Sequence, residues 1–464
     1  GQQMDDRSTQ IVSQISSSVQ TTASVVGAGV LGGQAIIGGT SNSLASSTNA
    51  VHLLLLLRYI DAGYPPNVES FFDMTSRNAP SNDSSIIPEV FLFVRVGNLS
   101  QYQSKWYRFG EYKLSVNFLT NCGTSVLICF FSLVMSGILM IVKKYAKRKS
   151  ALVDNILYRF KWNQILSCVA NNQSKLALGW FLQFSGTVFD AYGISNLIIA
   201  VLSLLGVAIV IVVSVNHTRW NWRVTRDKLF LSREAIKASE PRQKQYAFVV
   251  NDVVTETSVG RYFFVLSFAK VLLIVAIIFW LPKAPIAQIY LLLFTNIFFI
   301  LALLIGKPYK ELEKQLAMLS NEIIMLLQEV LMAVFATNKQ VKFLSYTQWM
   351  VMGWIFIGLI LLSLVVNAFV AIFIIIKALV ISWRNKKKKS KRLRKRVSQS
   401  VIRTNILTPQ GRIKKHSSRI VRNRNQFSTI LGSSFSREIK SLKLKLHFIV
   451  ACVESEQLHF KFSA

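Results

Sequence analysis

The chain has 464 residues, of which 52% are hydrophobic and 16% are charged, and its mean hydropathy is +0.39. These values exclude a disordered chain and disfavour a soluble enzyme. The 54 Lys and Arg residues outnumber the 22 Asp and Glu residues, which gives a formal net charge of +32. Such a balance is common in nucleic-acid-binding proteins, but here long apolar runs separate the basic clusters. The sequence therefore predicts an integral, multi-pass membrane protein.

Residues 1–62 predict either a helical hairpin in the membrane or juxtamembrane helices that pack on the bundle. Two mildly apolar stretches, 25–39 and 44–60, flank an uncharged tip at 40–43. No basic region precedes the first apolar stretch, so a standard signal peptide is not expected. The chain begins with Gly1 rather than Met, which leaves open processing or an ectodomain N-terminal to Gly1.

Residues 63–115 predict a small extracytoplasmic loop. The alternating stretch Val90–Val96 predicts a short strand in it. Asn82 and Asn98 each begin an Asn-x-Ser sequence, and both become candidate glycosylation sites if the loop lies outside. The loop holds none of the four cysteines, which excludes a cap stapled by disulfides.

Residues 116–381 predict a bundle of seven spans, because each crossing needs about 20 mostly apolar residues. The second candidate is studded with polar residues, including Asn172 and Lys175. One basic segment, 143–162, precedes this candidate, and another, 217–260, follows the third candidate. Both segments can be cytoplasmic only if the chain crosses the membrane twice between them, so the second candidate is assigned as a span. With the N-terminal hairpin the total is seven to nine. The seven candidates are Val116–Val142, Gln164–Phe184, Ile194–Val215, Arg261–Leu281, Ala287–Gly306, Met318–Ala336 and Met350–Ile381.

The charge distribution predicts the orientation of the bundle. The segments 143–162, 217–260, 307–317 and 384–464 together carry +29 of the net +32. Lys and Arg near membrane ends favour the cytoplasmic side. We therefore expect residues 382–464 to form a basic cytoplasmic tail of a protein in the plasma membrane or an endomembrane.

Ionisable residues inside spans are costly and tend to be functional. Lys270 lies in the fourth span, and Glu322, Gln328 and Glu329 lie in the sixth. In one interpretation Glu329, with Gln328 and Glu322, lines a hydrated path for cations. In the other, Lys270 and Glu329 form a buried pair that locks two helices. The sequence leaves both open.

Four further polar residues lie within apolar spans. For these we expect interhelical hydrogen bonds, worth on the order of 1 kcal/mol each. They are Asn196, Gln288, Asn296 and Asn367.

Ten of the thirteen residues from Arg384 to Arg396 are basic. Such a cluster predicts binding of anionic inner-leaflet lipids, and it also acts as a stop-transfer signal. Ser398 follows it in a context that favours basophilic kinases, and a phosphate there would weaken the attraction. Nucleic acid is disfavoured as a partner because no aromatic residues interleave the basic ones. The candidate lipid-binding residues are Arg384, Lys386, Lys387, Lys388, Lys389, Lys391, Arg392, Arg394, Lys395 and Arg396.

The sequence contains no constellation that predicts catalysis. It has no nucleophile elbow, no phosphate-binding loop and no Cys/His spacing typical of zinc. The string Gly27-x-Gly29-x-x-Gly32 lacks the βαβ context of a dinucleotide site. We therefore expect no enzyme activity, no cofactor and no metal, and the sequence leaves a homo-oligomer open.

From Lys161 to Trp383 the order of features resembles the multi-span C-terminal module of large protist surface proteins, which is similar to the fungal transient-receptor-potential-like membrane proteins. The resemblance implies a cation-channel-like or transport-related bundle, and Lys307 stands where the pattern has arginine. The pieces that carry it are Lys161-Trp162-Asn163, Pro282–Pro285 with Gln288 beyond, Lys307-Pro308-Tyr309, Asn321-Glu322, and Tyr64-Pro65-Pro66 after the run Leu53–Leu57.

The predicted fold is thus an all-α, polytopic transmembrane bundle with a small extracytoplasmic loop and a basic tail. Two functions are compatible with this fold, and the resemblance implies the first of them. The first is a cation-channel-like or transport-related protein, and the alternative is a non-conducting anchor and signalling module of a larger surface protein.

Overall fold

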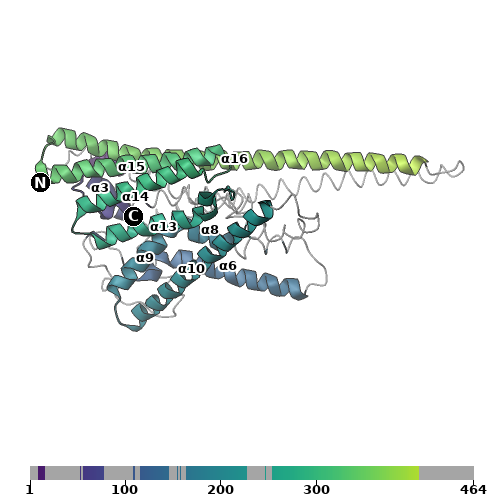
Figure 1. The fold of residues 1–464 in the computed structure, drawn as a ribbon, viewed down its shortest axis with the longest axis horizontal. Coiled ribbons are helices and arrows are strands. Elements are labelled where there is room, and N and C mark those ends of the chain that lie inside the picture. Colours follow the sequence, from purple (N-terminus) through teal and green to yellow (C-terminus); the bar gives the residue numbers. More distant parts are fainter. Residues whose placement is uncertain are drawn as a thin grey trace. The chain divides into compact units, whose positions relative to one another are not determined.

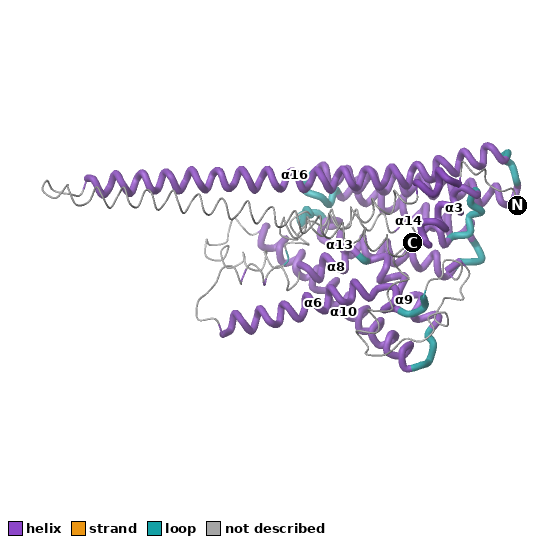
Figure 2. Tube along the Cα trace, turned by 180° about the vertical axis from the view of Figure 1, so that it is seen from behind, coloured by secondary structure: helices purple, strands orange, loops and turns teal. Residues whose placement is uncertain are grey.

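The computed structural model describes residues 9–15, 53, 56–77, 108–109, 115–145, 154, 157, 163–226, 246 and 253–406. The chain forms two compact units, 1–372 and 373–464. In the described residues the regular structure is helical, and Val253 and Tyr309 form an isolated β bridge (Figures 1 and 2). The elements are η1 (Leu57–Tyr59), α3 (Pro66–Arg77), α6 (Phe118–Tyr145), α8 (Gln164–Asn171), α9 (Gln173–Gly186), α10 (Ala191–Arg226), α13 (Ser258–Trp280), α14 (Pro285–Gly306), α15 (Leu312–Val341) and α16 (Tyr346–Ile406).

Six of these helices are long and apolar enough to cross a bilayer, which confirms a helical membrane protein. They match six of the seven predicted spans. The membrane-length stretches are Ser125–Tyr145, Ala191–Val224, Ser258–Trp280, Pro285–Gly306, Leu312–Val341 and Tyr346–Val370.

The remaining predicted span, Gln164–Phe184, is not one continuous helix. It consists of α8 and α9, which meet at Asn172. The side-chain amide of Asn172 donates to the carbonyl of Cys168 at 2.9 Å. Asn side chains compete in this way with the helical backbone, which accounts for a break among the polar residues 171–175.

Contacts along the broken segment show that it runs antiparallel to α6. The thiol of Cys168 in α8 donates to the carbonyl of Ser125, 3.4 Å away in α6. Near the end of α9, Gln183 accepts from the backbone amide of Phe118 at the start of α6, at 2.8 Å. These contacts place α8 and α9 against the first two turns of α6, from Phe118 to Ser125.

Prolines and one left-handed residue set the turns between α13, α14 and α15. Pro282 follows α13, and Pro285 begins α14 where its missing amide hydrogen is tolerated. Lys307 ends α14 with a φ of 38° and precedes Pro308. These short connections place α13, α14 and α15 side by side (Figure 1), and at Gly306 there is room for no side chain against Val259.

Helix α16 is much longer than the predicted span Met350–Ile381. It continues through the basic cluster to Ile406, in a stretch that was expected to be tail. Lys, Arg and Leu are strong helix formers, and the first proline after Tyr346 is Pro409. The backbone of 384–396 is therefore helical, while the side chains of residues 385–406 lie outside the described residues.

The segment 57–77 packs on the end of the bundle where α15 turns into α16. The sequence assigned 57–62 to the N-terminal hairpin or juxtamembrane helices and 63–77 to the loop. In the structure α3 is a helix that begins at Pro66 and buries Val68, Phe71 and Phe72. The Asn67 amide donates to the carbonyl of Met350 at the start of α16, at 3.1 Å. We call 57–77 the cap, this end of the bundle the cap end, and the opposite end, where α14 meets α15, the far end.

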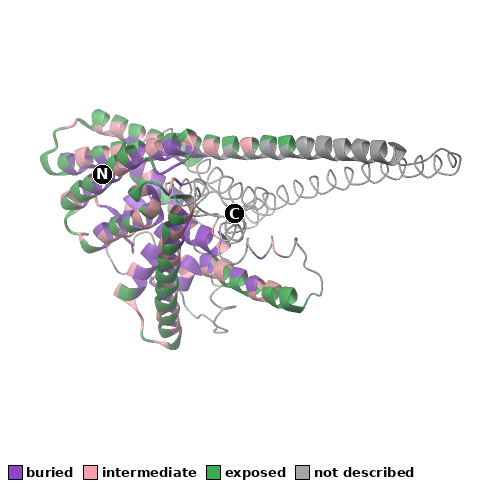
Figure 3. Cartoon of the chain, turned by 45° about the vertical axis from the view of Figure 1, so that its right-hand side comes forward, coloured by how far each residue is buried: buried purple, intermediate pink, exposed green. Residues whose placement is uncertain are grey.

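Several predictions lie outside the described residues. These are the strand at 90–96, the sequons Asn82 and Asn98, most of the N-terminal hairpin and residues 407–464. The described part of the second apolar stretch forms η1 and then extended chain rather than a continuing helix. Buried residues gather where the helices meet, and exposed apolar residues cover the outward sides of α6, α10 and α14 (Figure 3).

Candidate functional site

The predicted intramembrane residues converge on one place between α13, α14 and α15. Lys270 lies in the middle of α13, and Glu322 and Glu329 lie two turns apart on α15. Asn296, half-way along α14, stands between them. All four side chains are buried. We call these four residues the polar cluster.

Lys270 forms its ion pair with Glu322, not with Glu329 as the helix-locking interpretation expected. The ammonium group of Lys270 donates directly to a carboxylate oxygen of Glu322. It also donates to the side-chain oxygen of Asn296 at 3.3 Å, and it lies 4.5 Å from the ring centre of Phe299. The charge of Lys270 is thus neutralised by Glu322, which the first interpretation placed beside a path for cations.

Asn296 connects the ion pair to Glu329. Its amide nitrogen donates to the backbone carbonyl of Glu322 at 3.1 Å and to Glu329 Oε2 at 3.4 Å. Its oxygen accepts from Lys270, so both ends of the amide are used. The sequence analysis expected only an interhelical hydrogen bond for Asn296. Its position half-way along an apolar helix was the signal that could have placed it with the ionisable residues.

Two side chains of this region keep polar atoms without a hydrogen-bond partner in the described part of the chain. Glu329 Oε1 has none, and neither the oxygen nor the nitrogen of the Gln328 amide has one. Both side chains are fully buried. Unpartnered polar groups in a bilayer cost free energy and need a reason other than packing.

A second polar group links α15 to α16. Asn321 and Asn367 exchange amide hydrogen bonds at 2.9 and 3.1 Å, and Asn367 also donates to the carbonyl of Ser363 at 2.8 Å. The sequence analysis named Asn321 only as part of the resemblance and missed Ser363. Asn321 is seven residues before Gln328 and so shares its face of the helix.

The expectation of interhelical hydrogen bonds is confirmed. The side chain of Asn196 accepts from the amide of Leu119 at 2.9 Å, and Gln288 donates to the carbonyl of Ile278 at 2.9 Å. Asn296 and Asn367 make the bonds described above.

The polar cluster lies between two apolar clusters. Toward the far end these are Phe263, Phe299, Leu303 and Met318, all buried. Toward the cap end Met332 and Phe335 of α15 follow Glu329. The cluster is therefore closed toward both ends in this conformation.

The basic cluster and Ser398 lie in α16. Of these residues the structure describes the side chain of Arg384, which is exposed, and for the others it describes the backbone alone.

Comparison of the chain with known protein families, with curated proteins and with solved structures finds no match.

Proposed function

We propose that this chain is a transport-related membrane protein that moves a singly charged cation, a proton or a monovalent metal ion, through the polar cluster. One observation carries the proposal. The cluster has two carboxylates for one ammonium, and the second carboxylate, Glu329, keeps an oxygen without a partner in the described residues. A bound cation would balance the excess carboxylate, whereas a purely structural pair needs only Lys270 and Glu322.

The proposed topology has seven crossings, with α8 and α9 as one broken span. Their 22 helical residues would extend about 33 Å at a rise of ~1.5 Å per residue, which is enough for the hydrocarbon core. Phe181 of α9 lies 5.6 Å from Trp280 at the end of α13, in keeping with a full crossing. Broken helices in transporters commonly border the transport site.

We place the far end in the cytoplasm because the basic segments 143–162, 217–260 and 307–317 belong to it. The basic stretch of α16 would then bind anionic lipids of the inner leaflet, at about 1 kcal/mol per basic residue near the surface. Phosphorylation of Ser398 would weaken that binding. The resemblance to the protist and fungal modules agrees with this arrangement and remains part of the proposal.

The test is ion flux into liposomes that contain the full chain, with Na⁺, K⁺ and pH gradients applied separately. We expect flux of one cation in the wild-type chain and its loss in Glu329→Gln, which keeps the shape of the side chain. The matched control is Glu313→Gln on the same helix, near the far end, which should keep the flux. Flux that is unchanged in Glu329→Gln, or absent from the wild-type chain, contradicts the proposal.

A non-conducting anchor is the second candidate. The contacts that favour it are those by which Lys270 and Asn296 tie three helices together between apolar clusters. In that case Glu329→Gln would alter the stability of the chain, and no gradient would drive flux in any variant.

A further inference from the structure

Aromatic side chains fill the bundle between the polar cluster and the cap end. Phe335 lies six residues beyond Glu329 on α15, about 9 Å further along the axis. Its ring centre is 6.1 Å from that of Phe356 in α16, and both side chains are fully buried. These rings therefore lie between Glu329 and the cap end along α15.

Half of this aromatic cluster comes from the cap rather than from a membrane-length helix. The ring of Tyr64 lies 6.1 Å from Phe335 and 5.8 Å from Phe356. Phe72 of α3 lies 5.3 Å from Tyr64, edge to face, and 6.1 Å from Phe356. We call these four residues, Tyr64, Phe72, Phe335 and Phe356, the aromatic seal.

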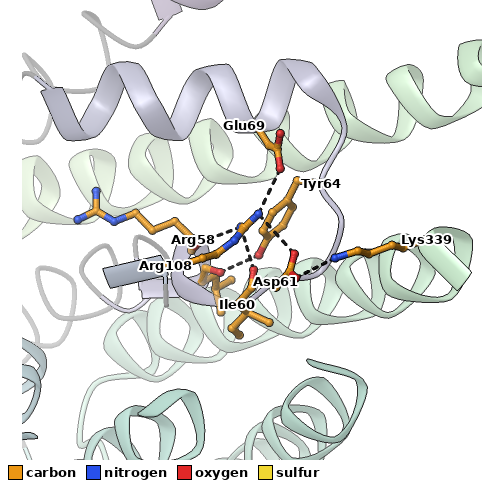
Figure 4. A network of polar contacts seen from close by, with 8 residues as sticks. Arg58, Ile60, Asp61, Tyr64, Glu69, Arg108 and Lys339 are labelled. Atoms are coloured by element: carbon orange, nitrogen blue, oxygen red, sulfur yellow. Dashed lines mark hydrogen bonds and ion pairs between the residues drawn. The ribbon is translucent and has the colours of Figure 1, made fainter. Parts of the chain in front are cut away.

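One ion pair at its edge joins the cap to the bundle, and Arg108 adds contacts to the cap itself (Figure 4). Lys339, in the last turn of α15, donates to Asp61 at 2.8 Å. Arg108 approaches the same carboxylate at 3.5 Å and donates to Glu69 at 3.2 Å and to the carbonyl of Ile60 at 3.1 Å. The side chain of Lys339 is 50% exposed, so water reaches this contact and can compete for it.

The closure toward the far end is built differently. Phe263, Phe299 and Met318 belong to α13, α14 and α15 themselves. Val253 and Tyr309, in the connections that precede α13 and α15, complete that cluster. Because Phe263, Phe299 and Met318 would close it without them, opening there still requires membrane-length helices to move. At the cap end, withdrawal of 57–77 would remove Tyr64 and Phe72 while all the helices of the bundle stay in place.

We propose that the cap, residues 57–77, is a movable lid that closes the polar cluster toward the cap end, with the Asp61–Lys339 contact as its latch. The proposal rests on the proposed function in one respect, namely that Glu329 exchanges a cation with the solution at this end. The closing contacts themselves do not depend on what is transported.

The test measures access to Met332, which is fully buried between Glu329 and Phe335 on α15. Met332→Cys is introduced into the full chain with the four native cysteines replaced by alanine, and the protein is reconstituted in liposomes. A charged, membrane-impermeant thiol reagent is added to intact vesicles. We expect labelling to be about fivefold faster after Lys339→Ala, the factor that corresponds to loss of one exposed ion pair.

The matched control is Lys283→Ala. Lys283 is an exposed lysine in the α13–α14 turn, also at the cap end, and it forms no ion pair within the described residues. It should leave the labelling rate unchanged. A second lid variant, Tyr64→Ala, removes one ring of the aromatic seal and should accelerate labelling even if another contact replaces the latch.

Labelling rates that stay unchanged in both Lys339→Ala and Tyr64→Ala overturn the lid. Flux measured on the same vesicles separates the two proposals. Faster labelling without flux in any variant leaves the lid in place and removes the transport function. Flux in the wild-type chain with unchanged labelling removes the lid and keeps the transport function.

Discussion

At the scale of single residues, the buried charge on Lys270 has the largest predicted effect on stability. Replacing it by Met leaves the Glu322 carboxylate buried without its ammonium partner. Breaking a buried pair in this way costs about 3–5 kcal/mol, whereas removing both charges is often close to neutral. We therefore expect Lys270→Met to destabilise the chain strongly and Lys270→Met with Glu322→Gln to recover most of the loss.

The measurement is reversible unfolding of the purified chain in mixed detergent micelles, followed by tryptophan fluorescence. If the double variant is as unstable as Lys270→Met alone, the ion pair with Glu322 is not the source of the stability that Lys270 contributes.

A second residue-scale prediction concerns Glu69 in the cap. Burial raises the pKa of this carboxyl above its ordinary value of 4.5; Arg108 opposes the shift, and Asp73 and Asp61 add to it. Because the folded chain then binds the proton more tightly than the unfolded chain, the stabilisation is present below the ordinary pKa. This stabilisation is lost as the pH rises through the raised pKa of Glu69. We therefore expect the cap to open more often as the pH increases through that range.

Hydrogen exchange of residues 57–77, corrected for intrinsic rates, measures this loosening. Glu69→Gln should abolish the pH dependence in that range. If the Gln variant keeps the same dependence, another group of the network causes it.

At the scale of elements, periodicity and apolar length predicted α13, α14 and α15 well and failed where polar residues or the basic cluster intervened. The break at Asn172 could not be placed, because a polar helix and a broken helix have the same composition. The end of α16 was missed because a run of lysines was treated as tail although nothing in it breaks a helix. For α3 the signal was present, since Pro66 and the spacing of Val68 and Phe72 predict an amphipathic helix.

Close approach of α13 and α14 gives an element-scale prediction. A Cβ at Gly306 would meet the Val259 side chain at 2.4 Å, whereas a Cβ at Gly206 in α10 would meet nothing within 4 Å. Gly306→Ala should therefore destabilise the chain by about 1–3 kcal/mol through overpacking. Gly206→Ala, the matched control, should be neutral or stabilising by up to ~1 kcal/mol. Thermal unfolding in one detergent compares the two, and equal melting temperatures would contradict the close packing.

At the scale of the whole molecule, the sequence predicted which helices carry the site but not how its residues pair. Lys270, Glu322, Gln328 and Glu329 were recognisable because charge and amide groups are rare in apolar helices. Which carboxylate receives the lysine depends on helix rotation and on the position of Asn296, and neither follows from spacing along one chain. The net charge of the segments between spans, by contrast, does not depend on helix rotation or on side-chain pairing. It therefore predicts which end of the bundle is cytoplasmic.

That sidedness depends on whether α8 and α9 cross the bilayer, and two single cysteines can decide it. Thr187 follows α9, and Lys310 lies between α14 and α15. If the broken segment crosses, Thr187→Cys lies at the cap end and is labelled from outside in intact cells, while Lys310→Cys is labelled only after permeabilisation. If it does not cross, every later segment lies on the opposite side, and Thr187→Cys is on the cytoplasmic side with 143–162 and is not labelled in intact cells.

The basic segments 217–260 and 307–317 would then lie outside, contrary to the positive-inside rule. Three membrane-length helices, α10, α13 and α14, lie between the two positions, so the positions should face opposite sides. Labelling of both from the same side would mean an even number of crossings and would contradict this topology.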